Sequence, residues 1–149
     1  MIKQALDQDL KTALLSKDST RATLIRALKS AILYAEVATG QRENGLSDDE
    51  IIAVLQKEAK KRQESADLYQ KGGSPERAAH ELAEKTLIEV YLPPKLDDAE
   101  VAAIVKSVID ELGATSMAQM GQVIAAVKQK AGAGADSAVI ARIVKESLS

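Results

Sequence analysis

The sequence predicts an all-α protein: a four-helix amino-terminal domain, residues 1–92, followed by a three-helix carboxyl-terminal tail bundle, residues 93–149. Three observations lead to this prediction. Apolar residues recur at three- and four-residue spacing along most of the chain. Capping residues precede several of these stretches, and glycines follow them. Pro93 and Pro94 interrupt the pattern, because consecutive prolines cannot continue a helix.

The first two helices are predicted before residue 45. An amphipathic stretch of roughly fifteen residues begins near Ile2, and residues 16–20 break it. Asp18 or Ser19 can cap a second helix, because a short polar side chain accepts a hydrogen bond from the free amides of the first turn. That helix is expected to end near Gly40, before a polar, glycine-containing loop.

Two further helices are predicted before the prolines. Ser47 and Glu50 have the spacing of a capping box, so a third helix should start there. Gly72 and the glycine after it are expected to end this helix. Ser74 should cap a fourth helix, with Pro75 in its first turn, where a missing N–H costs nothing.

The segment after the prolines predicts three short helices. The first has an acidic start at residues 97–100. A second capping box is predicted from Ser116 and Gln119, and Gly132 should end that helix. Asp136 is expected to cap the last helix. Tight turns between short helices are typical of a small bundle near the lower size limit for independent folding.

Composition restricts the function classes. The chain has no cysteine, which excludes disulfides, thiolate metal sites and a cysteine nucleophile. His80 is its single histidine, so we expect a surface residue, no metal site and no cofactor. No apolar run approaches membrane-spanning length, and we expect a cytoplasmic protein that does not contact a membrane. The net charge of −2 means that any nucleic-acid binding must come from a local basic patch.

The densest basic run covers residues 57–64. Four cations over about two turns could face phosphates. Charge runs on helices are more often solvated faces, and here Glu58 precedes Arg62 by four residues, as Lys60 precedes Glu64. We favour the solvated face. No serine lies in a nucleophile-elbow context and no carboxylate pair stands out, so no catalytic residue is predicted.

The turn around Gly132 has a more specific distribution of charge. Lys128 and Lys130 precede it, where cations favour the negative end of a helix, so a purely structural role is one interpretation. The same turn leads to the amino end of the last helix, whose free amides could meet a phosphate, and Arg142 and Lys145 follow on that helix. Asp136 at the cap partly opposes phosphate binding.

The chain as a whole resembles the YqeY family, whose members share a carboxyl-terminal domain with the B subunit of the tRNA-dependent aspartyl/glutamyl amidotransferase. The matching pieces are Arg21 with residues 23–29 and 31–32, residues 57–69 with Arg62 and Ser65, Glu81, Tyr91-Leu92-Pro93, Met120-Gly121-Gln122-Val123 and residues 130–136. Residues 74–76 depart from the family pattern, in which we expect an arginine and an aspartate near the glycines. Ile124 stands where methionine is frequent.

This resemblance implies a non-catalytic accessory protein whose tail binds tRNA or a tRNA-amidotransferase-type complex. The family label of carbon–nitrogen ligase activity with glutamine as amido-N-donor looks inherited through the shared tail, because the amidase and kinase-like parts of that enzyme are absent here. The predicted nucleic-acid-binding residues are Lys128, Lys130, Arg142, Lys145, Gly121 and Gly132. The alternative is a protein-interaction adaptor with no nucleic-acid role, for which an apolar patch on the amino half would be evidence. An enzyme activity of its own is the third hypothesis.

Overall fold

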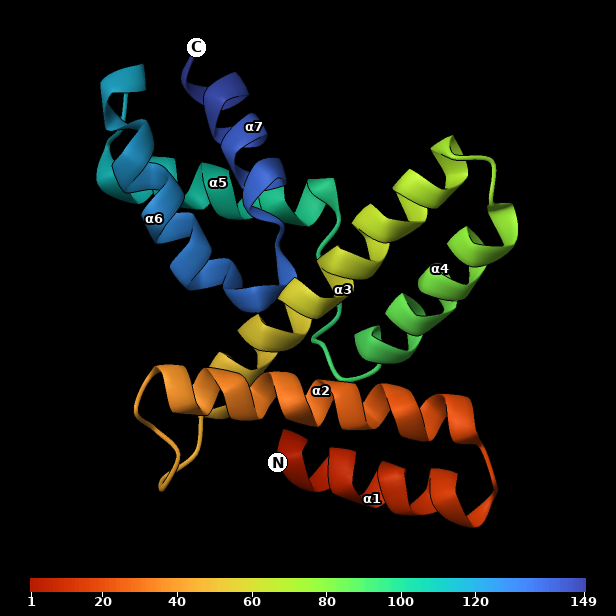
Figure 1. The fold of residues 1–149 in the computed structure, drawn as a ribbon. Coiled ribbons are helices and arrows are strands. Elements are labelled where there is room, and N and C mark those ends of the chain that lie inside the picture. Colours follow the sequence, from red (N-terminus) through yellow and green to blue (C-terminus); the bar gives the residue numbers. More distant parts are fainter. The chain divides into compact units, whose positions relative to one another are not determined.

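The computed structural model describes residues 1–149 and contains seven α-helices and no β-strand, which confirms the all-α class (Figure 1). The α-helices are α1 (Ile2–Leu15), α2 (Ser19–Ala38), α3 (Asp48–Lys71), α4 (Pro75–Glu89), α5 (Asp98–Leu112), α6 (Met120–Ala131) and α7 (Ser137–Leu148). Two single-turn 3₁₀ helices, η1 (Met117–Gln119) and η2 (Gly132–Gly134), lie at the two ends of α6.

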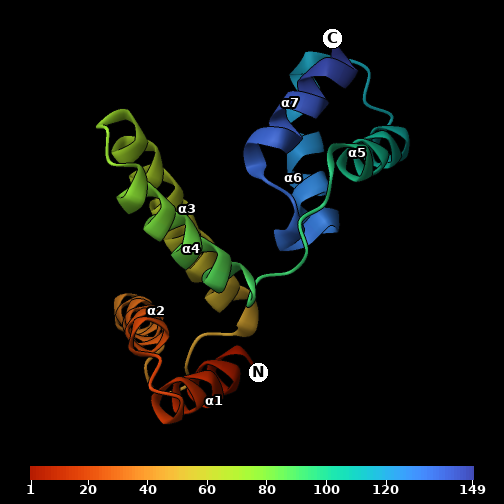
Figure 2. The same ribbon diagram turned by 90° about the vertical axis from the view of Figure 1, so that its right-hand side faces the viewer.

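The chain forms two compact units, Met1–Leu92 and Pro93–Ser149. In the amino unit, α1 and α2 form one antiparallel hairpin, and α3 and α4 form a second one (Figures 1 and 2). Helix α2 packs against α3 and joins the two hairpins. The core of the amino unit consists of aliphatic side chains: Leu6, Leu24, Ile25, Leu28, Ile32, Ile51, Leu55, Ala59 and Ile88. All three tyrosines of the chain, Tyr34, Tyr69 and Tyr91, belong to this unit.

Small side chains and ion pairs hold the α3–α4 hairpin together. Ala59, Ala66 and Ala78 are buried, so the two helix backbones approach closely. Arg62 is central among the polar contacts, because it pairs with Glu58 on its own helix and with Glu84 on α4, at 3.3 Å from Nε to Oε2. The run 57–64 is thus partly turned inward, toward α4, rather than wholly solvated.

The expected pair between Lys60 and Glu64 is wrong, since no ion pair forms between them. Both side chains are exposed, whereas the Glu58–Arg62 pair that was predicted alongside it does form. His80 is exposed, as expected for a surface residue, and its Nε2 lies 3.4 Å from Glu84 Oε1.

The three helix caps predicted in the amino unit lie at the predicted residues, and two of the three side chains make a capping hydrogen bond. Asp18 caps α2 by accepting a hydrogen bond from the Arg21 amide at 3.1 Å. Ser47 and Glu50 form the predicted capping box of α3. Ser74 occupies the N-cap position of α4 and Pro75 its first turn, as predicted, but the Ser74 side chain makes no capping hydrogen bond.

In the tail unit α5, α6 and α7 pack against one another in a bundle (Figure 2). Its core contains only aliphatic side chains: Val101, Val105, Val108, Ala114, Val123, Val127, Ile140, Ile143, Val144 and Leu148. Asp97 and Glu100 form a capping box at α5, and Asp136 caps α7 as predicted. The capping box expected from Ser116 and Gln119 is wrong: a 3₁₀ turn precedes α6, and Gln119 Oε1 instead accepts from the Thr115 amide at 2.8 Å.

Gly134 is the glycine that the tail unit's own packing requires. A Cβ at Gly134 would lie 2.9 Å from the Pro94 carbonyl oxygen and 3.4 Å from Leu96 Cγ. The Leu96 amide donates a hydrogen bond of 2.8 Å to the Gly134 carbonyl. The segment after the double proline is therefore fixed to the turn between α6 and α7, and only glycine leaves room for that contact.

Candidate nucleic-acid interface in the tail unit

The four predicted cations come from two helices of the tail. Lys128 and Lys130 lie in the last turn of α6, and Arg142 and Lys145 lie on α7. Because α-helical residues are about 100° apart, Lys128 and Lys130 point about 200° from one another, to different sides of α6. Arg142 and Lys145 are three residues apart and therefore share one side of α7.

Lys130 is paired with a carboxylate of α5. Its Nζ lies 2.5 Å from Glu111 Oε1 and 3.5 Å from Ser107 Oγ. The Lys130 ammonium holds the pKa of Glu111 below its ordinary value, chiefly through this hydrogen bond. Both side chains are substantially exposed, so water and salt weaken the pair, and a phosphate could replace Glu111 as the partner of Lys130.

Arg142 has two carboxylate partners. Its Nη2 lies 2.7 Å from Asp98 Oδ2 at the start of α5, and its Nη1 lies 3.5 Å from Glu146 Oε1 one turn later on α7. The hydrogen bond with Asp98 raises the pKa of Arg142 above its already high ordinary value. Arg142 thus connects α7 to α5, and its charge is balanced within the tail unit.

Lys128 and Lys145 differ from these two residues. Both are exposed, and neither forms an ion pair. Among the four predicted contacts they are the cations whose charge is available to a phosphate without breaking an existing pair. The structure therefore separates the predicted set into two free lysines and two cations held by carboxylates.

The two predicted glycines have different roles. At Gly132 φ is +63°, a conformation that favours glycine, and this residue ends α6. Gly121 lies inside α6 without a positive φ, and a Cβ there would meet no atom within 4 Å. Packing within the tail does not require glycine at position 121. At the start of α7, Asp136 accepts a hydrogen bond of 2.7 Å from the Ala138 amide, so a carboxylate already lies where an anion would meet the free amides.

One surface feature was missed by the sequence analysis. Leu33, Tyr34 and Val37 on α2 are 43%, 76% and 57% exposed. They lie outside the stripe that the periodicity assigns to the core, which is formed by residues 24, 25, 28, 31, 32 and 35. Large apolar residues off the core stripe of an amphipathic helix were the signal available in the sequence.

The structure contains no group of three or more histidine, aspartate or glutamate side chains placed to hold a metal ion. None of its helices is both long and apolar enough to cross a membrane.

Comparison with protein families matches the family described as Yqey-like protein to residues 3–148 of this chain. The chain belongs to the YqeY family. The match covers α1 through α7, so both units lie within the family's extent.

A curated relative of this YqeY protein is "Altered inheritance of mitochondria protein 41, mitochondrial" from Eremothecium gossypii. It is 33% identical over 112 residues, which cover 74% of this chain and 60% of the relative. The chain thus spans about three fifths of that relative's length. The name of this relative associates it with mitochondria.

Proposed function

We propose that this YqeY protein is a non-catalytic accessory protein that binds the phosphate backbone of tRNA through its tail unit. The observation that carries the proposal is that Lys128 and Lys145 are exposed and have no carboxylate partner, whereas the other two predicted cations, Lys130 and Arg142, are paired. Gly121 adds a position on α6 where a partner can approach the backbone. The family resemblance of the tail to that of the amidotransferase B subunit supports tRNA as the polyanion.

In this proposal, Lys130 and Arg142 exchange their carboxylate partners for phosphates when RNA binds. Each makes its ion pair at a largely exposed position, where the net free energy of such a pair is small. A phosphate that approached Lys130 or Arg142 could take the place of Glu111 or Asp98 at little cost. Because Lys128 and Lys130 point to different sides of α6, the four cations would meet phosphates on more than one side of the tail.

We also propose that the two units are separate domains with different roles, and that the protein acts in the cytoplasm. The four helices of Met1–Leu92 and the three of Pro93–Ser149 act as separate domains, each with its own aliphatic core. The tail domain contacts RNA, or a tRNA-amidotransferase-type complex that holds RNA. We place the protein in the cytoplasm.

Titration of the full-length chain into fluorescently labelled bulk tRNA tests the proposal by anisotropy at two salt concentrations. Changing both Lys128 and Lys145 to Glu should abolish most of the affinity. Changing both to Gln should make the negative slope of log K against log salt shallower by about 2, because two phosphate contacts are lost.

The matched control is Lys106→Glu on α5, which is exposed, unpaired and in the same unit but outside the proposed set. It reverses one charge, so it is compared with Lys128→Glu alone, which should weaken binding more. No measurable binding at low salt, or equal losses in these two variants, rejects the RNA proposal. Glutamine-dependent amidation by the purified chain would reject the non-catalytic part.

A further inference from the structure

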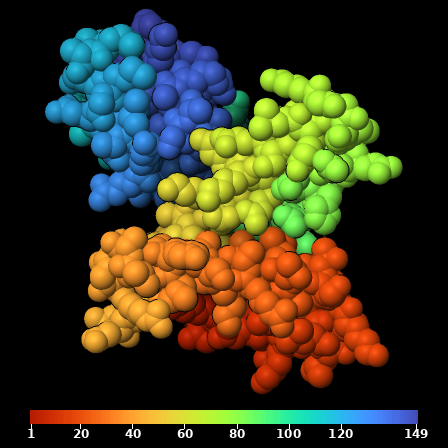
Figure 3. Space-filling model, viewed as in Figure 1, coloured from red at the N-terminus to blue at the C-terminus, as the bar shows by residue number.

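The α1–α2 hairpin contains a groove on a side that the α3–α4 hairpin does not cover. The groove has a volume of about 350 Å³. Its floor is formed by the buried side chains Leu6 and Ile32, and its walls include Lys3 and Asp7 from α1 and Ser30 and Leu33 from α2. Figure 3 shows α1 and α2, in red and orange, at the surface of the amino unit.

Two stripes of side chains extend this groove along the hairpin. Arg26, Ser30, Leu33 and Val37 recur at positions i, i+4, i+7 and i+11 of α2, so they lie along one side of that helix. On α1 the residues at the same spacing are Lys3, Asp7, Leu10 and Leu14. Lys3, Asp7, Ser30 and Leu33 line the groove itself, which shows that both stripes border it. The α2 stripe is about 16 Å long, or three helical turns.

The two ends of the surface differ in chemistry. Toward the carboxyl end of α2 it is apolar, since Leu33, Tyr34 and Val37 are exposed there. The Lys3–Glu36 ion pair also lies at this end, because Glu36 stands between Tyr34 and Val37, and its charges cancel. In the middle, the charges of Lys29 and Asp7 cancel in a second pair.

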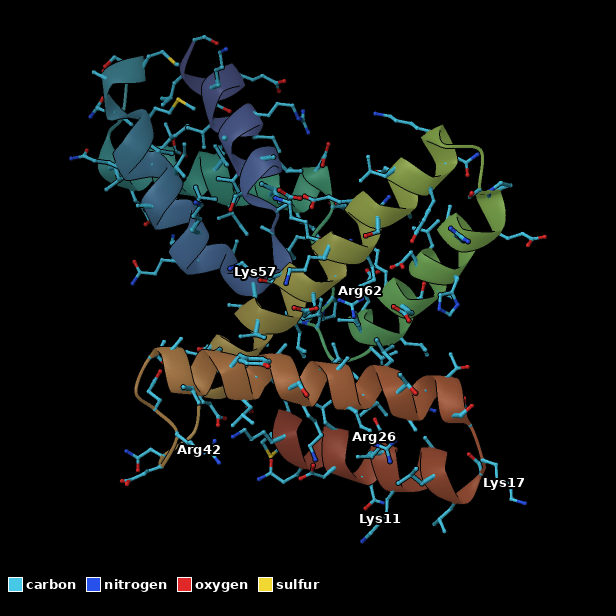
Figure 4. The ribbon with its side chains drawn as sticks, viewed as in Figure 1. Lys11, Lys17, Arg26, Arg42, Lys57 and Arg62 are labelled. Carbon is cyan, nitrogen blue, oxygen red and sulfur yellow. The ribbon has the colours of Figure 1, made fainter.

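Toward the turn between α1 and α2, the charge is not balanced. Lys11, Lys17 and Arg26 are exposed and form no ion pair, and Figure 4 shows all three on the half of the hairpin that contains its turn. The carboxylates of this half have other partners: Asp18 caps α2, and Asp9 contacts Tyr91 and Arg21. The end near the turn therefore carries unbalanced positive charge beside the exposed Leu14, whereas at the other end exposed apolar side chains surround one balanced ion pair.

We propose that this groove binds an amphipathic helix of another protein, with its apolar stripe against Leu33 and Val37 and its carboxylates facing Arg26. A helix fits because the α2 stripe is three turns long and the groove is bordered by two helices, which is the geometry of helix-in-groove recognition. The unbalanced cations select an acidic partner over a basic one. This surface lies on the amino unit and is separate from the residues proposed to contact RNA.

The test uses two synthetic helical peptides with full-length protein. Both peptides carry leucines at i, i+4, i+7 and i+11; one has three glutamates in a terminal turn, and the other has lysines in their place. Fluorescence anisotropy should show that the acidic peptide binds at least about tenfold more tightly than the basic one. Leu33→Asp should lower the affinity for the acidic peptide by about tenfold or more, because the substitution places a charge in the apolar part of the groove.

Matched variants distinguish peptide binding at the groove from non-specific effects of the same substitution elsewhere on the protein. Leu82 on α4 is 41% exposed, close to the 43% of Leu33, so Leu82→Asp should leave peptide binding unchanged. Arg26→Glu should reverse the preference toward the basic peptide, whereas Lys60→Glu, at an exposed and unpaired position of α3, should not. The variant with Lys128 and Lys145 changed to Glu should bind the peptide normally, which keeps this test independent of tRNA binding.

Four results would overturn the proposal. They are absence of binding by either peptide, equal affinity for both, an unchanged affinity after Leu33→Asp, and a loss after Leu82→Asp as large as after Leu33→Asp. Two further measurements identify other occupants. Binding to vesicles of phosphatidylserine and phosphatidylcholine that depends on Leu33 and Arg26 would assign the surface to lipid. Concentration-dependent dimerisation in sedimentation, abolished by Leu33→Asp, would assign it to a second copy of the chain.

Discussion

The Tyr91 hydroxyl donates a hydrogen bond to the Asp9 carboxylate, so the residue that precedes Leu92 and the double proline is fixed to α1. Arg21 on α2 lies 3.9 Å from the same carboxylate oxygen. These three side chains connect α1, α2 and the end of the amino unit. Burial and the Asp9 charge together raise the pKa of Tyr91 from 10.0 to about 12, because both disfavour the phenolate.

Replacing Tyr91 with Phe should lower the free energy of unfolding by about 1 kcal/mol, the net contribution of one hydrogen bond, when measured by urea denaturation near neutral pH. The raised pKa also predicts a pH dependence. The protonated phenol contributes stability below the ordinary pKa of 10.0, and this contribution is lost as pH rises toward about 12. The difference in stability between the parent protein and Tyr91→Phe should therefore shrink over that interval. A constant difference would contradict this assignment.

Glu36 on α2 is the buried charged residue of the chain, 4% exposed, and Lys3 on α1 is its partner. The hydrogen bond with Lys3 lowers the pKa of Glu36 below 4.5 despite burial. The pair therefore stabilises the fold above pH 4.5 and loses its effect as pH falls through the lowered pKa. Changing Lys3 to Met leaves a buried carboxylate without its cation, so acid unfolding followed by circular dichroism should begin at higher pH. Lys29→Met breaks the pair with Asp7, whose side chain is 60% exposed, and should change the pH at which acid unfolding begins only a little.

Gly134→Ala should destabilise the tail unit by about 1–3 kcal/mol, because its Cβ would press against the Pro94 carbonyl and neither backbone can easily yield. Hydrogen exchange of the Leu96 amide, which is bonded to the Gly134 carbonyl, should accelerate in parallel. Gly121→Ala is the control: its Cβ meets open space, so stability should stay constant or rise by up to about 1 kcal/mol. Equal effects of the two substitutions would show that the close contact at Gly134 does not control stability.

Arg62→Met should destabilise the amino unit by about 2 kcal/mol, because the half-buried carboxylates Glu58 and Glu84 would both lose a charged hydrogen-bond donor. Thermal and urea denaturation of the full chain measure the loss. Lys61→Met removes a more exposed partner of Glu58, and we expect a change below about 0.5 kcal/mol. If Arg62→Met were as mild as Lys61→Met, the polar contacts between α3 and α4 would be dispensable.

The sequence could predict those features that depend on residues close together in the chain. The stripe on α2 and the caps at Asp18, Ser47 and Asp136 are set within one or two helical turns, so periodicity and capping rules identify them. At Ser74 the same rules locate the start of α4, but the serine hydroxyl makes no capping hydrogen bond, and at Ser116 the predicted capping box does not form. A capping pattern gives the residue types and leaves the local backbone geometry undetermined.

Contacts between distant segments were beyond these rules. Lys130 and Glu111 are nineteen residues apart, and Arg142 and Asp98 are forty-four residues apart, so nothing in local spacing indicates that the cations of the predicted site already have partners. The close approach of Pro94 to Gly134 is likewise a contact between distant segments, and the sequence pattern indicated Gly121 and Gly132 instead. Helical periodicity shows which side of a helix is buried; it does not show which helix covers it.

The location of the three tyrosines has an optical consequence. Pro93–Ser149 contains no aromatic side chain, so intrinsic fluorescence and near-ultraviolet dichroism report on Met1–Leu92 alone. Far-ultraviolet dichroism, by contrast, sums the helices of both parts. Label-free melting curves at the two wavelength ranges would separate if the segments on either side of the prolines unfold independently, and they would superimpose if the whole chain unfolds as one cooperative system.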